Sequence, residues 1–202
     1  MRTIKMLVSK SMLRILLLIF ISPLSWGACD ISKFNILEIR ALHNKFSEAP
    51  SSDNAADLIM AMPDRFCEFN ALYGYDKEAG PLYDSPLYNQ FEKLTAYIDH
   101  KVLINKYVAL ASEAKWDADS VNYLQYSYRE LFLKHPKESI ASILSLPKNK
   151  ARTAVNFLFD GPHPSQKILK EPTRSKICNI NSNFCEILGK VESTLLEKEH
   201  HH

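Results

Sequence analysis

Apolar residues recur along most of the chain at steps of three and four, with polar residues between them. This period places the apolar side chains on one face of an α-helix. The first such run extends from Ile31 to Phe46, and the last from Asn183 to Lys198. Between them the pattern predicts helices over residues 53–62, 63–74, 85–98, 100–115, 117–135, 136–146 and 149–160.

Local signals mark where several of these helices begin and end. Asp53 and Asn149 stand where a side-chain oxygen caps a helix, and Gly74 stands where a helix stops. Pro136 suits the first turn of a helix, because proline lacks the amide N–H that an interior position needs. Residues 165–176 are polar and contain a proline, so we expect irregular chain there.

Strand signals are absent from the sequence. No run of five residues alternates between β-branched and polar types, and Asp160-Gly161 precedes a proline instead of a second strand. The sequence therefore predicts an all-α protein of about seven to nine helices. Residues 56–63 and 141–147 are weakly alike, each an apolar helix that leads through a proline into a second helix. Such units stack in repeat proteins, so we expect a compact bundle or a short stack of helical hairpins.

The first 28 residues differ from the rest. Four cations, Arg2, Lys5, Lys10 and Arg14, precede a short apolar run at residues 15–21, and small residues follow it. This order is typical of a secretory signal peptide, and the apolar run is too short to span a bilayer. We therefore predict a signal peptide at residues 1–28, one helical domain at 29–198, and a disordered tail or tag remnant at 199–202.

The four cysteines fit an exported protein. An even number in an oxidising compartment favours two disulfides, and we expect Cys29–Cys67 and Cys178–Cys185. No Cys-x-x-Cys pair is present, which argues against a structural zinc site. Cys29 also follows Trp26-Gly27-Ala28, which partly resembles a bacterial lipobox. Lipidation of Cys29 would attach the protein to a membrane, and this alternative stays open.

Charge argues against nucleic acid as a partner. The whole chain has 25 Lys and Arg against 23 Asp and Glu. Loss of the four cations of the signal peptide would leave a net charge of about −2 on the mature chain. Proteins that bind polyanions instead concentrate positive charge. We therefore expect neither nucleic acid nor a cofactor, and no metal site.

Candidate catalytic residues are few. No phosphate-binding glycine loop, His-Glu-x-x-His or Gly-x-Ser-x-Gly motif occurs. Asp160 and His163 flank a Gly-Pro turn, where the aspartate could orient the imidazole as a general base, although aspartate in such turns usually serves local hydrogen bonds. Asp117 and Asp119 are better explained as helix caps than as a carboxylate pair.

The candidate binding residues are Trp116, Tyr126, Asp160, Gly161, Pro162 and His163. The last four form a rigid turn suited to contact with a partner. The chain has 9 tyrosines, a residue type favoured in binding surfaces because it offers a large rigid area with one polar tip. Tyr123, Tyr126 and Tyr128 cannot all face inward on one helix, so at least one should be exposed.

These patterns favour a periplasmic or secreted bacterial protein that binds another protein of the cell envelope. An inhibitor or immunity-type protein is the specific form of this hypothesis. A small secreted hydrolase or metal-dependent enzyme that uses Asp160 and His163 is the alternative, and a lipid-anchored envelope scaffold is a further one. A homodimer is compatible with the same tyrosine-rich surface.

Overall fold

The computed structural model describes residues 29–75, 78–83 and 90–200. The predicted signal peptide, residues 1–28, lies outside these ranges, as do residues 201–202. Within the described ranges the chain contains no β-strand, and one antiparallel bridge joins Tyr75 to Ala79. The predicted all-α fold class is confirmed.

The described residues form eleven α-helices and one 3-10 helix. Those of eight residues or more are α1 (Ile36–Glu48), α2 (Ser52–Ala61), α3 (Phe66–Tyr73), α6 (His100–Ala111), α7 (Ser120–Lys134), α8 (Pro136–Leu144), α9 (Lys148–Phe159) and α12 (Ser182–His200). The shorter ones are α5 (Gln90–Lys93), η1 (Leu94–Ala96), α10 (Pro164–Lys167) and α11 (Thr173–Cys178). The long helices follow the predicted pattern, whereas one-turn helices are too short to show a period.

Two predicted caps are wrong because a neighbouring residue takes the position. The hydroxyl of Ser51, not the carboxylate of Asp53, accepts a backbone N–H at the start of α2, at 3.2 Å. α9 begins at Lys148, directly after Pro147, so Asn149 lies inside its first turn. In both places the residue at the N-cap position stands two positions earlier than expected.

The loop before α7 also departs from the expected capping. Asp119 precedes α7 with a φ of 61°, but its side chain makes no capping hydrogen bond. The Asp117 carboxylate accepts from the N–H of Ala118 at 2.8 Å. Both aspartates therefore shape the loop, and neither caps the helix through its side chain.

Three further predictions concern where helices end and where the chain is irregular. Gly74 ends α3 as expected. Residues 165–176, expected to be irregular, instead hold most of α10 and of α11. The final helix extends through Glu199 to His200, so the predicted tail at 199–202 begins too early.

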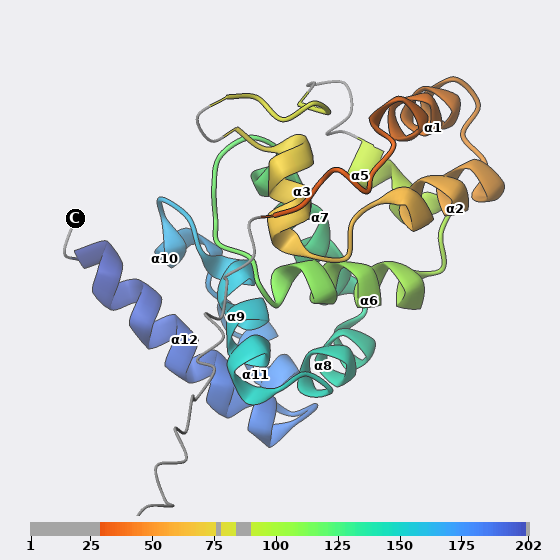
Figure 1. The fold of residues 1–202 in the computed structure, drawn as a ribbon. Helices are drawn as coiled ribbons and strands as arrows, with labels where there is room; N and C mark the ends of the chain where they lie inside the picture. Colours follow the sequence, from red (N-terminus) through yellow and green to blue (C-terminus); the bar gives the residue numbers. More distant parts are fainter. Residues whose placement is uncertain (1–28, 76–77, 84–89, 201–202) are drawn as a thin grey trace, which may run out of the picture.

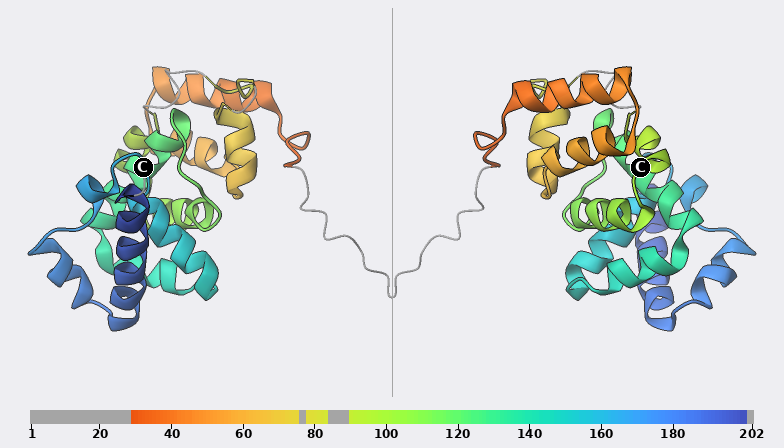
Figure 2. Two further views of the ribbon diagram at one scale, coloured as in Figure 1. Left: turned by 90° about the vertical axis from the view of Figure 1, so that its left-hand side faces the viewer. Right: turned by 90° about the vertical axis from the view of Figure 1, so that its right-hand side faces the viewer.

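The N-terminal and C-terminal helices lie at opposite ends of the molecule (Figures 1 and 2). α1 packs on α2 at one end, and α12 runs along α9 at the other. α6 lies between them and contacts α3, α7, α8 and α9. All of these helices contribute buried apolar side chains to one continuous core. This core fixes the loop before α7 relative to the loop after α9, and these loops carry most of the candidate site residues.

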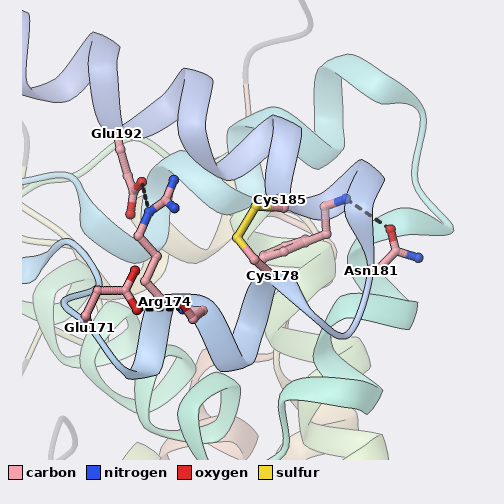
Figure 3. The surroundings of a disulfide bond; sticks show 8 residues. Glu171, Arg174, Cys178, Asn181, Cys185 and Glu192 are labelled. Carbon is pink, nitrogen blue, oxygen red and sulfur yellow. Dashed lines mark hydrogen bonds and ion pairs between the residues drawn. A yellow bond between two sulfur atoms is a disulfide. The ribbon is translucent and has the colours of Figure 1, made fainter.

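The predicted Cys178–Cys185 disulfide is formed, with the two Cα atoms 4.7 Å apart (Figure 3). It joins the end of α11 to the first turn of α12. Beside it, Arg174 Nε donates to Glu192 Oε2 at 3.0 Å, again between α11 and α12. A covalent bond and an ion pair thus hold the short helix α11 on the long one.

Cys29 and Cys67 are free thiols in the structure, so the expected bond between them is not formed. The two side chains nevertheless lie beside each other in one hollow, close enough for Cys67 to affect the pKa of Cys29. Burial, and after it the contact with Cys67, raises the pKa of the Cys29 thiol to about 11. Because the thiols are in contact, a second disulfide stays a prediction for the oxidised protein.

Candidate functional site

Four of the six candidate binding residues line one hollow, which we name the tryptophan hollow. Trp116 comes from the loop before α7, and Asp160, Gly161 and Pro162 come from the loop between α9 and α10. The last turns of α12 form the opposite wall. The lining residues are Trp116, Asp160, Gly161, Pro162, Pro164, Leu195, Lys198 and Glu199, and the volume is about 400 Å³.

The loop between α9 and α10 has a fixed shape. Gly161 has a φ of +141°, a backbone conformation that residues with a side chain rarely adopt. A Cβ atom at this position would lie only 2.6 Å from Lys167 Nζ. The Asp160 carboxylate accepts from Asn156 Nδ2 at 3.2 Å and from the Gly161 N–H at 3.0 Å. Asp160 therefore shapes the turn by local hydrogen bonds, the role that aspartate usually has in turns.

His163 forms no hydrogen bond with Asp160, although both residues belong to the described part of the chain. Its side chain is 66% exposed, and its Nδ1 lies 3.9 Å from Glu199 Oε1. Glu199 also accepts from the backbone N–H and the hydroxyl of Ser165, each at 2.9 Å. A general base needs the group that orients it within hydrogen-bond distance. The expected arrangement of Asp160 beside His163 is therefore not assembled.

Trp116 is half-buried, and its indole Nε1 is buried without a hydrogen-bond partner in the described part of the chain. The ammonium group of Lys167 lies over its ring, 5.8 Å from the ring centre. A cation at this distance is attracted by the electrons of the ring. Lys167 comes from α10, so the contact joins the loop before α7 to the segment after α9.

Lys167 is also held by hydrogen bonds. Its Nζ donates to Gln125 Oε1 at 2.7 Å and to the Asp160 carbonyl oxygen at 2.8 Å. The buried Gln125 side chain in turn donates to the carbonyl oxygens of Phe157 at 2.5 Å and Asp160 at 2.9 Å. Partial burial, and after it the nearby charge of Arg129, lowers the pKa of the Lys167 ammonium group. This network fixes α7 against the α9–α10 loop.

Tyr126, another candidate binding residue, does not line the tryptophan hollow. It lines a second hollow of about 310 Å³, which we name the tyrosine hollow, together with Glu92, Asn122, Tyr123, Gln125, Arg129 and Lys167. Tyr126 is 50% exposed and Tyr123 is 41% exposed, whereas Tyr128 is fully buried in the core. The expectation that the three tyrosines of α7 cannot all face inward is confirmed.

Gln125, Arg129 and Lys167 were not predicted as site residues. Gln125 and Arg129 look like ordinary polar positions of an amphipathic helix, and Lys167 lies in a segment expected to be irregular. Arg129 Nη2 donates to the Lys167 carbonyl oxygen at 2.9 Å, which adds a further link between α7 and α10. Only the folded chain brings these three residues together, and no local motif marks them.

Comparison with known proteins gives no match: no protein family model, curated protein or solved structure shows significant similarity to this chain. Among the described residues, no helix is long and apolar enough to span a membrane. The same part of the chain has no group of three or more His, Cys, Asp or Glu side chains placed to hold a metal ion.

Proposed function

We propose that this chain is an exported, disulfide-containing helical protein that binds another protein of the bacterial envelope, and that it acts as an inhibitor or immunity-type protein. The binding surface in this proposal comprises the tryptophan and tyrosine hollows and Lys167 between them. We refer to it as the two-hollow surface. The Cys178–Cys185 disulfide is compatible with an oxidising compartment outside the cytoplasm.

The observation that carries the proposal is the position of the aromatic residues around Lys167. Tyr123 and Tyr126 are exposed and line the tyrosine hollow together with this lysine. The same lysine lies over the ring of Trp116, which lines the tryptophan hollow. Tryptophan, tyrosine and arginine contribute most to binding energy at protein interfaces when they lie beside pockets that a partner can fill. Arg129 lines the same surface. The residue types and the paired hollows therefore suit a protein partner.

The support beneath this surface is rigid. Gln125 is buried and bonded at both ends of its amide group, and Gly161 fixes the path of the α9–α10 loop. A surface that is already in its binding shape loses little conformational entropy on association, which raises affinity for a given contact area. A tight inhibitor has this property.

Partner capture from envelope extract tests the proposal. Immobilised wild-type protein should retain one partner in stoichiometric amount. Tyr126→Ala should reduce the retained amount at least about tenfold, since truncation of a central aromatic residue commonly has this effect. Tyr75→Ala is the matched control, because Tyr75 is a similarly exposed tyrosine, at 52%, that lines neither hollow.

The control should bind as the wild type does. If both variants lose the partner to the same extent, the partner does not bind through the two-hollow surface. Absence of any stoichiometric partner for the wild-type protein would contradict the proposed function itself.

A further inference from the structure

Two cations lie side by side in the tyrosine hollow, and neither forms an ion pair with a carboxylate of the described residues. Within these residues, Lys167 donates to a side-chain amide oxygen and a backbone carbonyl oxygen. Arg129 donates through Nη2 to a backbone carbonyl oxygen, and its Nε is buried with no acceptor in the described part of the chain. Both residues line the hollow. Positive charges that are partly removed from water are costly unless a negative charge compensates them.

The acids nearby compensate these charges only in part. The Asp160 carboxylate is engaged by Asn156 and by the Gly161 N–H, and only its carbonyl oxygen reaches Lys167. Glu92 lines the hollow, yet it forms no ion pair with Arg129 or Lys167, both of which belong to the described residues. Partial burial, and after it the proximity of Arg129, lowers the pKa of the Lys167 ammonium group, and the charge of Asp160 opposes this shift only in part.

Donor capacity remains on both side chains. An ammonium group has three N–H bonds, and two of those on Lys167 are used, which leaves one. A guanidinium group has five, of which Arg129 uses one in the contacts described above. A planar acceptor with two oxygens matches this combination, since a carboxylate accepts several hydrogen bonds from charged donors.

We propose that the tyrosine hollow is a receptor for one carboxylate, presented by an aspartate or glutamate side chain of the protein partner. This inference rests on the proposed function and specifies the chemistry of the partner. The carboxylate lies between Arg129 and Lys167, and the rings of Tyr123 and Tyr126 cover the methylene groups behind it. Glu92 at the hollow adds a like charge, which opposes a doubly charged anion such as phosphate more strongly than a singly charged carboxylate.

A peptide titration tests this inference without knowledge of the partner. The probe is N-acetyl-Glu-Glu-amide, and the neutral N-acetyl-Gln-Gln-amide is its control. The readout is the indole N–H signal of Trp116 in two-dimensional NMR spectra, since Trp116 lies beside Lys167. The chain has 2 tryptophans, so a Trp116→Phe variant assigns the signal. The acidic peptide should shift it in a saturable way, and the neutral peptide should not.

Three variants locate the binding. Lys167→Met and Arg129→Gln should weaken binding of the acidic peptide at least about tenfold, because each removes one charged donor. Lys170→Met is the matched control, since Lys170 is an exposed lysine close by on the same segment that lines neither hollow. It should bind the peptide as the wild type does. The comparison of the two peptides on wild-type protein stands even where a variant fails to fold.

Several results would overturn the inference. These are equal shifts with both peptides, equal weakening by Lys170→Met and Lys167→Met, or no saturable shift at all. Saturation by inorganic phosphate at matched ionic strength, without saturation by the acidic peptide, would assign the hollow to phosphate instead. If a stoichiometric partner is captured while the acidic peptide fails to bind, the carboxylate receptor is wrong and the proposed function stands.

Discussion

The ammonium group of Lys167 lies 5.8 Å from the centre of the Trp116 ring, on the boundary between two hollows. Trp116 belongs to the tryptophan hollow and Lys167 to the tyrosine hollow. Any displacement of Lys167 changes the wall of the tyrosine hollow. It also removes the cation that lies over the Trp116 ring, which lines the tryptophan hollow. The two hollows should therefore respond together to changes at this lysine.

Gly161→Ala should destabilise the protein by about 1–3 kcal/mol, the usual cost of a side chain at a strongly positive φ. The new Cβ would also lie 2.6 Å from Lys167 Nζ and displace it. Chemical denaturation measures the change in the free energy of unfolding. A shift of the Trp116 indole signal should accompany it, because Lys167 lies over the ring.

Gly189→Ala is the control for that substitution. Gly189 lies within α12, and a Cβ there would meet Arg174 Nη2 at 3.7 Å, an ordinary contact. Alanine is preferred over glycine inside helices, so this variant should be more stable by up to about 1 kcal/mol. Equal destabilisation by both variants would show that the conformation of Gly161 is not the cause.

Gln125→Met should lower the free energy of unfolding by about 1–3 kcal/mol, since it removes the donor to the buried Phe157 carbonyl oxygen. It also leaves Lys167 and the Asp160 carbonyl oxygen with only each other as hydrogen-bond partners. Gln166→Met, at an exposed position of α10, should change stability by less than about 0.5 kcal/mol. Urea denaturation of both variants provides the measurement. Near-neutral behaviour of Gln125→Met would mean that the network contributes little.

Acidification should destabilise the protein through His43. This residue is fully buried, and its ring nitrogens contact Gln90 Oε1 at 2.6 Å and the Tyr73 hydroxyl at 2.8 Å. Burial lowers the pKa of His43 below its ordinary value of 6.5. The unfolded chain therefore takes up a proton before the folded chain does. The contribution of His43 to stability is complete above pH 6.5 and is lost as pH falls below it.

The free energy of unfolding of wild type and His43→Phe, measured between about pH 7.5 and pH 5, tests this assignment. The variant should be less stable at neutral pH, because Tyr73 and Gln90 lose a partner, but its stability should depend less on pH. Some dependence should remain, since burial and the neighbouring His100 lower the pKa of His135 as well. An unchanged pH dependence would contradict the role of His43.

Protein purified from its native host should contain a second disulfide between Cys29 and Cys67. Their thiols are in contact in the structure, and an oxidising compartment favours the bond. Intact mass after alkylation without reductant should show no labelled cysteine and a chain that lacks residues 1–27 or 1–28. Labelled thiols would contradict the second disulfide. A diacylglycerol-sized addition at Cys29 would establish the lipid anchor instead.

The helices were predictable where apolar residues recur along the sequence at the period of an α-helix. The run from Val121 to Leu131 follows the helical period of α7, and the burial of Tyr128 with exposure of Tyr126 follows from the same period. Short helices such as α10 were not predictable, because a single turn shows no period and depends on tertiary contacts. Caps failed for a related reason, since Ser51 and Asp53 are equally good candidates by residue type.

The candidate site was predictable only in part. Asp160, Gly161 and Pro162 stand out because a Gly-Pro turn has a local signature, and Trp116 was also among the candidate binding residues. That these four residues meet α12 in one hollow is a property of the folded core. Lys167 has no local signature, since its importance comes from Gln125 and Trp116, which are distant in the sequence.

The Glu199 contacts have a practical consequence for defining the folded unit. Both carboxylate oxygens of Glu199 bind Ser165, next to Pro164, and Glu199 itself lines the tryptophan hollow. A chain shortened after Lys198 would lose this clamp between α12 and α10, together with part of one wall of the hollow. The shortest chain that retains the complete two-hollow surface therefore ends at Glu199, and affinity tags are better separated from that residue by a spacer.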